Sequence, residues 1–187
     1  MEFKNVERYL NSFGKFIIKQ SRTNLTKAKK NVSKELYNSL RYTINVDKKD
    51  VTISFYMADY GTFVDKGVSG IKNIQEYRTY DGRIVESPFK YGKGTNPGGL
   101  RKGIRNWIKE RGLKGRVDKN WKSAGNKGGQ FITNKSLEFL IVRKIYTQGI
   151  KGISFFQRPL ELGMKRYGKQ ILQAIGKDIT ETITNEF

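Results

Sequence analysis

YMADYGTFVDKGVSG, residues 56–70, is the stretch that decides how this chain folds, because it follows the clearest strand pattern in the sequence and then breaks it. Residues 51–57 alternate apolar and polar side chains, which is typical of a half-buried strand. The glycines that follow allow positive φ or close approach of another segment. We expect a sharp exit from a sheet, although a glycine-rich loop held by a buried aromatic residue would show the same pattern. The residues of this corner are Tyr60, Gly61, Phe63, Val64, Asp65, Gly67 and Gly70.

Upstream of the corner, the pattern predicts a β-hairpin and two helices. Residues 41–46 alternate in the same way as 51–57, and the intervening residues 47–50 are typical of a turn. Apolar residues at three- and four-residue steps predict helices at 2–19 and 25–40, separated by a polar break at 21–24. We expect these two helices to cover one face of the hairpin.

Residues 71–130 are rich in glycine and lysine, and we expect them to form a long insertion. A small hairpin built on Asp81-Gly82 and a helix at 100–110 interrupt this insertion. The run YGKGTNPGG lacks the spacing of a phosphate-binding P-loop. A loop of this length in a compact domain is usually functional or becomes ordered on assembly.

Regular structure returns near the C-terminus of the sequence. A helix is predicted at 134–148, with Thr133 or Asn134 as its N-cap and Gly149 in the left-handed region after its end. A short strand at 150–156 and a long helix at 159–187 follow, with Pro159 in the first helical turn. The expected fold class is α+β: one small antiparallel sheet, formed by the 41–57 hairpin and the 150–156 strand, packed by several helices including a long C-terminal helix. The whole chain, 1–187, is expected to be a single domain with a basic insertion at about 71–130.

Two motifs carry a resemblance to a known family. The corner, with its Tyr-Gly-x-Phe-Val-Asp-x-Gly run, and the later segment GIKGISFFQRPLELG at 149–163 resemble the small tail-completion, or head–tail joining, proteins of tailed bacteriophages. The chain is most similar to the neck ring proteins of crAss-like phages. It differs by having Gly61 and Asp65 where alanine and glutamate are commoner in that family. The residues of the second motif that we expect at a subunit interface, together with those of the corner, are Gly152, Phe155, Phe156 and Pro159.

The resemblance implies a structural virion protein without enzymatic activity. It implies a homo-oligomeric ring in the neck between the portal side of the head and the tail, made in the host cytoplasm and contacting portal and other neck or tail proteins. It implies no cofactor and no metal.

Composition excludes several kinds of chemistry. The 187 residues include no cysteine and no histidine, so disulfides, thiolate or imidazole metal sites and Ser-His-Asp catalysis are impossible. No apolar run is long enough to cross a membrane. The first residues are not typical of a signal or transit peptide. We therefore expect a soluble protein with no membrane partner.

The charge of the chain suggests an anionic partner. There are 37 lysines and arginines against 17 acids, a formal net charge of +20. A charge of this size attracts nucleic acid or acidic protein surfaces, although a solvated lysine-rich surface would have the same composition. The glycine- and lysine-rich stretch 112–129 also contains Trp121, which can stack on a base. The candidate contacts to DNA or an acidic partner are Lys93, Arg101, Lys102, Arg105, Arg111, Lys114, Arg116, Lys119, Trp121, Lys122 and Lys127.

Two other functions are compatible with the sequence. The first is a stand-alone nucleic-acid-binding module, which predicts a steep salt dependence of DNA binding. The second is a magnesium-dependent nuclease, which needs converging carboxylates such as Asp59 and Asp65. The acids of this chain are thinly scattered, and Asp65 is also suited to pairing with a basic residue or accepting backbone N–H bonds.

Overall fold

A computed structural model describes residues 3–30, 33–47, 50–92, 98–120 and 128–185. The fold is α+β, as the sequence predicts. The helices are α1 (Lys4–Lys27), α2 (Glu35–Ser39), α3 (Gly61–Lys66), α4 (Gly98–Arg111), α5 (Asn134–Gln148) and α6 (Gln157–Asn185). The strands are β1 (Arg41–Val46), β2 (Val51–Tyr56), β3 (Val68–Ser69), β4 (Glu76–Arg78), β5 (Ile84–Glu86) and β6 (Gly149–Ile150).

The chain divides into two compact units. The first, here called the helix–hairpin unit, comprises Met1–Gly67, Glu76–Ser87 and Lys151–Phe187. The second, here called the basic unit, comprises Val68–Gln75 and Pro88–Ile150. The predicted insertion at 71–130 is thus shared: its β4–β5 hairpin packs within the helix–hairpin unit, and the remainder joins α5 in the basic unit.

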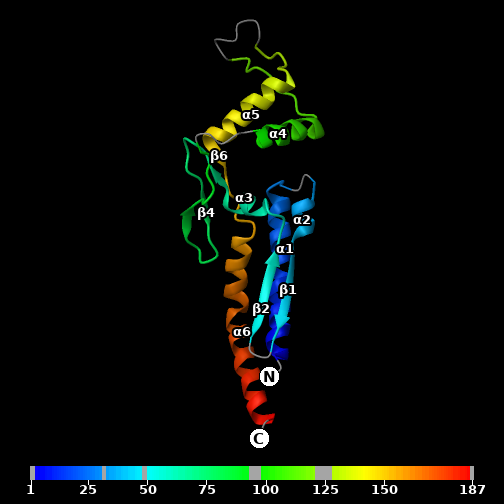
Figure 1. Ribbon diagram of the computed structural model, residues 1–187, viewed down its shortest axis with the longest axis vertical. Helices are drawn as coiled ribbons and strands as arrows, with labels where there is room; N and C mark the ends of the chain where they lie inside the picture. Colours follow the sequence, from blue (N-terminus) through cyan, green and yellow to red (C-terminus); the bar gives the residue numbers. More distant parts are fainter. Residues whose placement is uncertain (1–2, 31–32, 48–49, 93–97, 121–127, 186–187) are drawn as a thin grey trace. The chain divides into compact units, whose positions relative to one another are not determined.

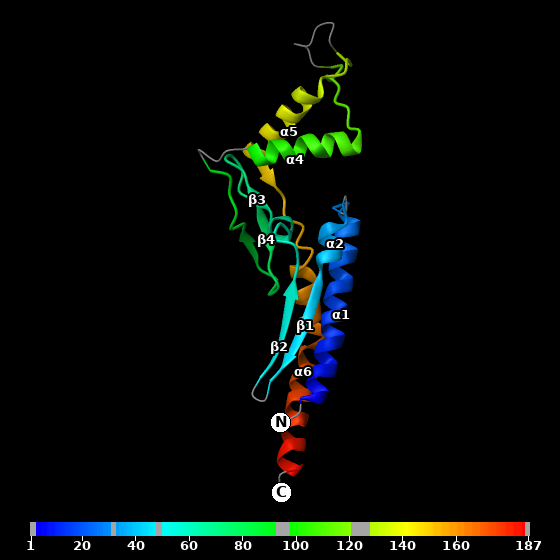
Figure 2. The same ribbon diagram turned by 45° about the vertical axis from the view of Figure 1, so that its right-hand side comes forward.

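The helix–hairpin unit is built on the pair α1 and α6, with the β1–β2 hairpin lying along them (Figures 1 and 2). The predicted hairpin is confirmed: it is antiparallel, and its register pairs Tyr42 with Phe55 and Ile44 with Ile53. Its apolar face packs against a core that includes Phe13, Ile17 and Phe156. Burial of these large side chains is the main source of stability for such a layer.

The predicted break between two N-terminal helices is wrong. α1 continues through residues 21–24 to Lys27, and α2 covers only Glu35–Ser39. The apolar stripe of α1 does not stop at the polar stretch, because Ser21 and Leu25 are fully buried on the same face as Ile17. The hydroxyl groups of Thr23 and Thr26 donate to carbonyls four residues earlier, so these polar residues are compatible with the helix.

The prediction of a single sheet is also wrong, since the strands form three separate two-stranded antiparallel sheets. β6 is only two residues long and pairs with β3, not with the 41–57 hairpin. The rest of the predicted 150–156 strand lies along the backbone of the corner instead. By contrast, the small hairpin predicted at Asp81-Gly82 is confirmed as β4–β5, with Gly82 at φ +88°.

The helices predicted at 100–110, 134–148 and 159–187 are confirmed as α4, α5 and α6, although residues 186–187 of the last one lie outside the described residues. α5 begins after Thr133, whose hydroxyl oxygen accepts from the Ser136 N–H at 3.1 Å. Gly149 follows α5 with a positive φ of 80°, but its ψ of −170° is extended and not left-handed helical. In the basic unit α4 and α5 pack together around Ile108 and Val142, both buried.

Candidate functional site

The corner forms the short helix α3 between β2 and Gly67. Gly67 has φ +77°, a conformation that favours glycine, and its N–H closes α3 by donating to the Phe63 carbonyl at 2.9 Å. Tyr60 and Phe63 are exposed on the outside of the corner, whereas Asp65 lies beneath it and is 2% exposed. The corner is therefore a sharp exit from the hairpin, as predicted, with Tyr60 and Phe63 on its outer side.

The two sequence motifs meet at a single junction. The N–H of Ile153 donates to the Val64 carbonyl at 3.1 Å, and the N–H of Ser154 donates to the Asp65 carbonyl at 2.9 Å. A Cβ placed on Gly152 would lie 2.6–2.7 Å from backbone atoms of residues 65–67, closer than real contacts allow. Only a residue without a side chain lets the two backbones approach in this way.

The carboxylate of Asp65 caps the first turn of α6. Its Oδ1 accepts from the Phe156 N–H at 2.8 Å, one residue before the helix begins. Burial raises the pKa of Asp65, and hydrogen bonds from the Phe156 and Gln157 backbone oppose this rise. The partially positive N-terminus of a helix suits a carboxylate. Of the two roles suggested for Asp65, the acceptance of backbone N–H bonds is the one observed.

A second buried aspartate, which the sequence did not indicate, caps the first turn of α1. Asp178 lies on α6, is 1% exposed, and accepts from the backbone N–H groups of Asn5 and Val6 at 3.1 and 2.9 Å. The side-chain amide of Asn5 also donates to it at 2.6 Å. Phe3, which precedes α1, makes no side-chain cap of its own.

An ion-pair cluster joins the β4–β5 hairpin to α6. Arg78 contacts Glu161 through two nitrogens, Nε and Nη2, each at 2.9 Å, and Lys165 contacts the same carboxylate at 2.8 Å. Hydrogen bonds from these two cations lower the pKa of Glu161 to about 2. The Arg78 N–H donates to the Ser154 hydroxyl, which ties the hairpin to the junction as well.

The carboxylates considered for a nuclease do not converge. Asp59 is exposed and Asp65 is buried against α6. Among the residues that the structure describes, no three histidine, cysteine or acidic residues are grouped so as to hold a metal ion. In the same described ranges, no helix is long and apolar enough to cross a membrane.

The candidate contacts to DNA or an acidic partner fall in the basic unit. Residues 68–75 and 88–150 contain sixteen lysines and arginines but only three acids. Arg101, Lys102, Arg105 and Arg111 are on α4, and Lys114, Arg116 and Lys119 follow it. Lys93, Trp121, Lys122 and Lys127 lie outside the described residues.

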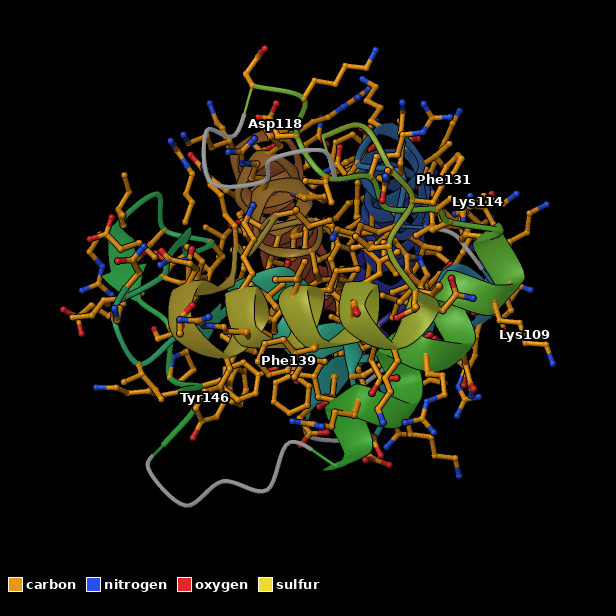
Figure 3. All side chains as sticks on the ribbon, turned by 90° about the horizontal axis from the view of Figure 1, so that it is seen from above. Lys109, Lys114, Asp118, Phe131, Phe139 and Tyr146 are labelled. Carbon is orange, nitrogen blue, oxygen red and sulfur yellow. The ribbon has the colours of Figure 1, made fainter. Side chains whose placement is uncertain are left out.

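An exposed aromatic side chain of the basic unit is also flanked by cations. The Arg116 guanidinium lies 4.1 Å from the centre of the Phe131 ring. The Lys114 ammonium lies 5.8 Å from the same ring, and Figure 3 shows Lys114 and Phe131 close together. The exposed ring thus holds two cationic side chains close together at the surface of the basic unit.

A groove of about 970 Å³ lies between α4 and α5. Its charged rim includes Arg101, Lys109 and Lys135, and its apolar lining consists of Ile108, Phe139 and Leu140. The buried acid Glu138 is neutralised within the groove, because Arg105 Nε contacts it at 2.9 Å. This hydrogen bond lowers the pKa of Glu138. The groove is thus positively charged at its edges and apolar inside.

Comparison of the chain with protein-family models, with curated proteins and with solved structures found no match.

Proposed function

We propose that this protein is a structural virion protein, a subunit of an oligomeric ring in the neck of a tailed phage that joins the portal side of the head to the tail. The observation that supports it is the junction in which Asp65 and Gly152 take part. The two motifs that carry the resemblance are about 90 residues apart in sequence, yet their hydrogen bonds make them one structural feature. A signature of a family is expected to consist of residues that act together in this way.

Exposed aromatic residues next to the junction support a role in assembly. Tyr56, Tyr60 and Phe63 are exposed although they are large and apolar, and aromatic side chains are enriched in protein interfaces. The junction gives them a rigid base, so a neighbouring subunit would meet a preformed surface. The protein acts in this proposal without turnover, and its excess positive charge faces packaged DNA or an acidic partner protein.

The test is assembly with the portal protein of the same virus. Native mass measurement and electron microscopy of the chain alone, of the portal alone and of their mixture should give a ring of this protein only in the mixture. A Tyr60→Ala/Phe63→Ala variant should fold but assemble less. A chain that stays monomeric beside portal and neck proteins would contradict the proposal.

The strong charge of the basic unit favours one second candidate, a stand-alone nucleic-acid-binding module. It predicts that the isolated protein binds duplex DNA with an affinity that falls steeply with salt. Replacing Arg101 and Lys102 by glutamine should then reduce both the affinity and its salt dependence. A nuclease would instead cut DNA with magnesium and lose this activity in Asp59→Ala or Asp65→Ala.

A further inference from the structure

A pocket on the helix–hairpin unit takes no part in the site described above. It has a volume of about 580 Å³ and lies beside α1 and α2, which Figures 1 and 2 show next to each other. Its lining consists of four cations, four hydroxyl-bearing side chains and the apolar Ile18, with no carboxylate from any residue that the structure describes. The four cations are Lys15, Lys19, Arg22 and Lys27. Because lysine, arginine and hydroxyl side chains all donate hydrogen bonds, a pocket of this composition is suited to an anion.

No neighbouring acid neutralises the charge of this pocket. Residues 15–34 contain seven lysines and arginines and no aspartate or glutamate. The three lysines of the pocket are exposed and form no ion pair with any residue in the described ranges. Glu35, the next acid along the chain, interacts with the Tyr60 hydroxyl. The pocket therefore keeps a concentrated positive charge that attracts anionic partners.

The arginine of the pocket is held in a fixed position. Its Nε and Nη2 donate to the backbone carbonyls of Tyr37 and Leu40 at 3.1 and 3.0 Å, and the guanidinium carbon of Arg22 lies 5.1 Å from the centre of the Tyr37 ring. These bonds use two of the five N–H groups of a guanidinium, so three remain for an anion. A side chain that is already ordered loses little conformational entropy when it binds.

The cations of α1 also lie in line. Lys15, Lys19, Thr23 and Lys27 follow one another at four-residue steps, so they form one row along the helix. At 1.5 Å per residue this row is roughly 18 Å long. A small anion would contact only one position of the row, whereas a nucleic acid presents a charge at every phosphate. Lysine, arginine and hydroxyl side chains are also the groups that contact DNA phosphates.

The tyrosines of the pocket are not placed to stack on bases. Tyr37 already contacts the Arg22 guanidinium. The ring of Tyr42 packs so closely on Gly14 that an added Cβ there would lie 2.6 Å from it, and the Tyr42 hydroxyl donates to the Asn11 side chain at 2.6 Å. Single strands are bound largely by stacking of their bases on aromatic rings, so this lining favours the backbone of a duplex.

We propose that this pocket and the lysine row of α1 bind the phosphate backbone of duplex DNA without reading its sequence. The lysines contact phosphates along the row, and Arg22 binds a phosphate through its three remaining N–H groups. The surface belongs to the helix–hairpin unit and is distinct from the candidate DNA contacts of the basic unit. The inference does not require the chain to form a ring, so it can be tested separately from the proposed function.

The test is binding of the full-length protein to a fluorescently labelled duplex of about 20 base pairs, followed by anisotropy at about 50 to 200 mM salt. Lys15→Gln/Lys19→Gln removes two phosphate contacts. The slope of log affinity against log salt should therefore become shallower by about 0.9 for each contact and about 1.8 in all. The affinity at about 150 mM salt should fall by at least a factor of ten.

Two control variants separate this surface from the charge of the whole protein. Lys169→Gln/Lys177→Gln removes the same charge from two exposed lysines of α6 in the same unit and should change neither the slope nor the affinity. Lys102→Gln/Lys109→Gln tests the competing surface on α4. The inference is wrong if only the α4 variant loses affinity, if the α1 variant loses no more than the α6 control, or if a single strand of the same length binds more tightly than the duplex.

A footprint locates the contact without any substitution. Duplex DNA should slow chemical acetylation of Lys15, Lys19 and Lys27, measured by mass spectrometry of the digested protein, and should leave Lys169 reacting at its original rate. Protection confined to lysines of the basic unit would contradict the inference.

The outcomes also distinguish this inference from the proposed function. A ring formed with the portal protein by a chain that does not bind duplex DNA would overturn the inference and leave the neck function standing. Loss of DNA binding in Lys15→Gln/Lys19→Gln, together with a wild-type chain that forms no ring beside the portal, would support the inference and count against the neck function.

Discussion

Replacing Asp65 by alanine tests whether the corner carries a structural cap or a catalytic group. The change removes the acceptor of the Phe156 N–H, a bond of 2.8 Å in a buried site. A hydrogen bond to a charged group contributes about 1.5–3 kcal/mol, and leaving a buried donor unpaired costs about 1–3 kcal/mol. These two figures describe the same loss and are not added. Because burial disfavours the ionised carboxylate and so offsets part of this loss, we expect a net decrease of about 1–2 kcal/mol in the free energy of unfolding.

The assay is thermal and urea unfolding followed by circular dichroism. For a unit of this size about 4 °C is lost per kcal/mol, so the melting temperature of Asp65→Ala should fall by roughly 4–8 °C. The matched control is Asp59→Ala, an exposed acid six residues earlier, which should change stability by no more than about 0.5 kcal/mol. If both variants melt within a degree of the wild type, the capping role of Asp65 is refuted.

The pH dependence of Asp65→Asn sharpens the same test. The pKa of Asp65 is raised in the folded protein, so the folded state holds this proton more tightly than the unfolded state does. Its contribution to stability is complete below the unfolded pKa, about 4, and is lost as the pH rises through the folded pKa. Asp65→Asn keeps an acceptor oxygen and has no such loss, so its stability relative to wild type should improve from pH 4 to pH 7. A constant difference would contradict this account.

Three further predictions follow from neighbouring contacts. Asp178→Ala should cost about 2–4 kcal/mol, because three donors lose their acceptor, and should speed amide hydrogen exchange in the first turn of α1. Glu161→Gln should make the stability of the protein less sensitive to acid. The Glu161 carboxylate stabilises the fold above its ordinary pKa of 4.5, and this stability is lost as the pH falls toward about 2. Urea unfolding midpoints of the variant and the wild type at pH 7 and pH 3 will measure the difference. Gly152→Ala should destabilise by about 1–3 kcal/mol through backbone clashes, whereas Gly168→Ala, which meets open space within α6, should stabilise by up to about 1 kcal/mol in the same melting assay.

Local patterns were sufficient to predict much of the fold. The hairpin register follows from strict alternation in two adjacent segments, and α5 follows from its apolar spacing and its Thr133 cap. The same reasoning failed at residues 21–24, where several polar side chains suggested a break. Ser21 is fully buried on the apolar face of α1. Because serine is small, the helix can bury it there, although its hydroxyl group suggests a polar break in the sequence.

The capping interactions could not be predicted from local patterns, because each joins residues that are distant in sequence. Asp65 and Phe156 are 91 positions apart, and Asp178 and Val6 are 172 apart. One signal was available: neither Phe3 nor Phe156 has a side chain that can cap the long helix it precedes. The first N–H groups of a helix need acceptors, so a long helix without a local cap indicates a distant one.

The two buried aspartates together hold the start of α6 and the start of α1 in place. Asp65 fixes the start of α6 at the corner, next to the exposed Tyr60 and Phe63. Asp178, about six turns further along α6, fixes α1 just before the exposed Ile179. At 1.5 Å per residue these two points are roughly 30 Å apart. Since α6 and α1 pack along this length, the corner is attached to a rigid pair of helices. A ring subunit that contacts its neighbour through the corner needs such a rigid base, so Asp65→Ala should weaken assembly as well as stability.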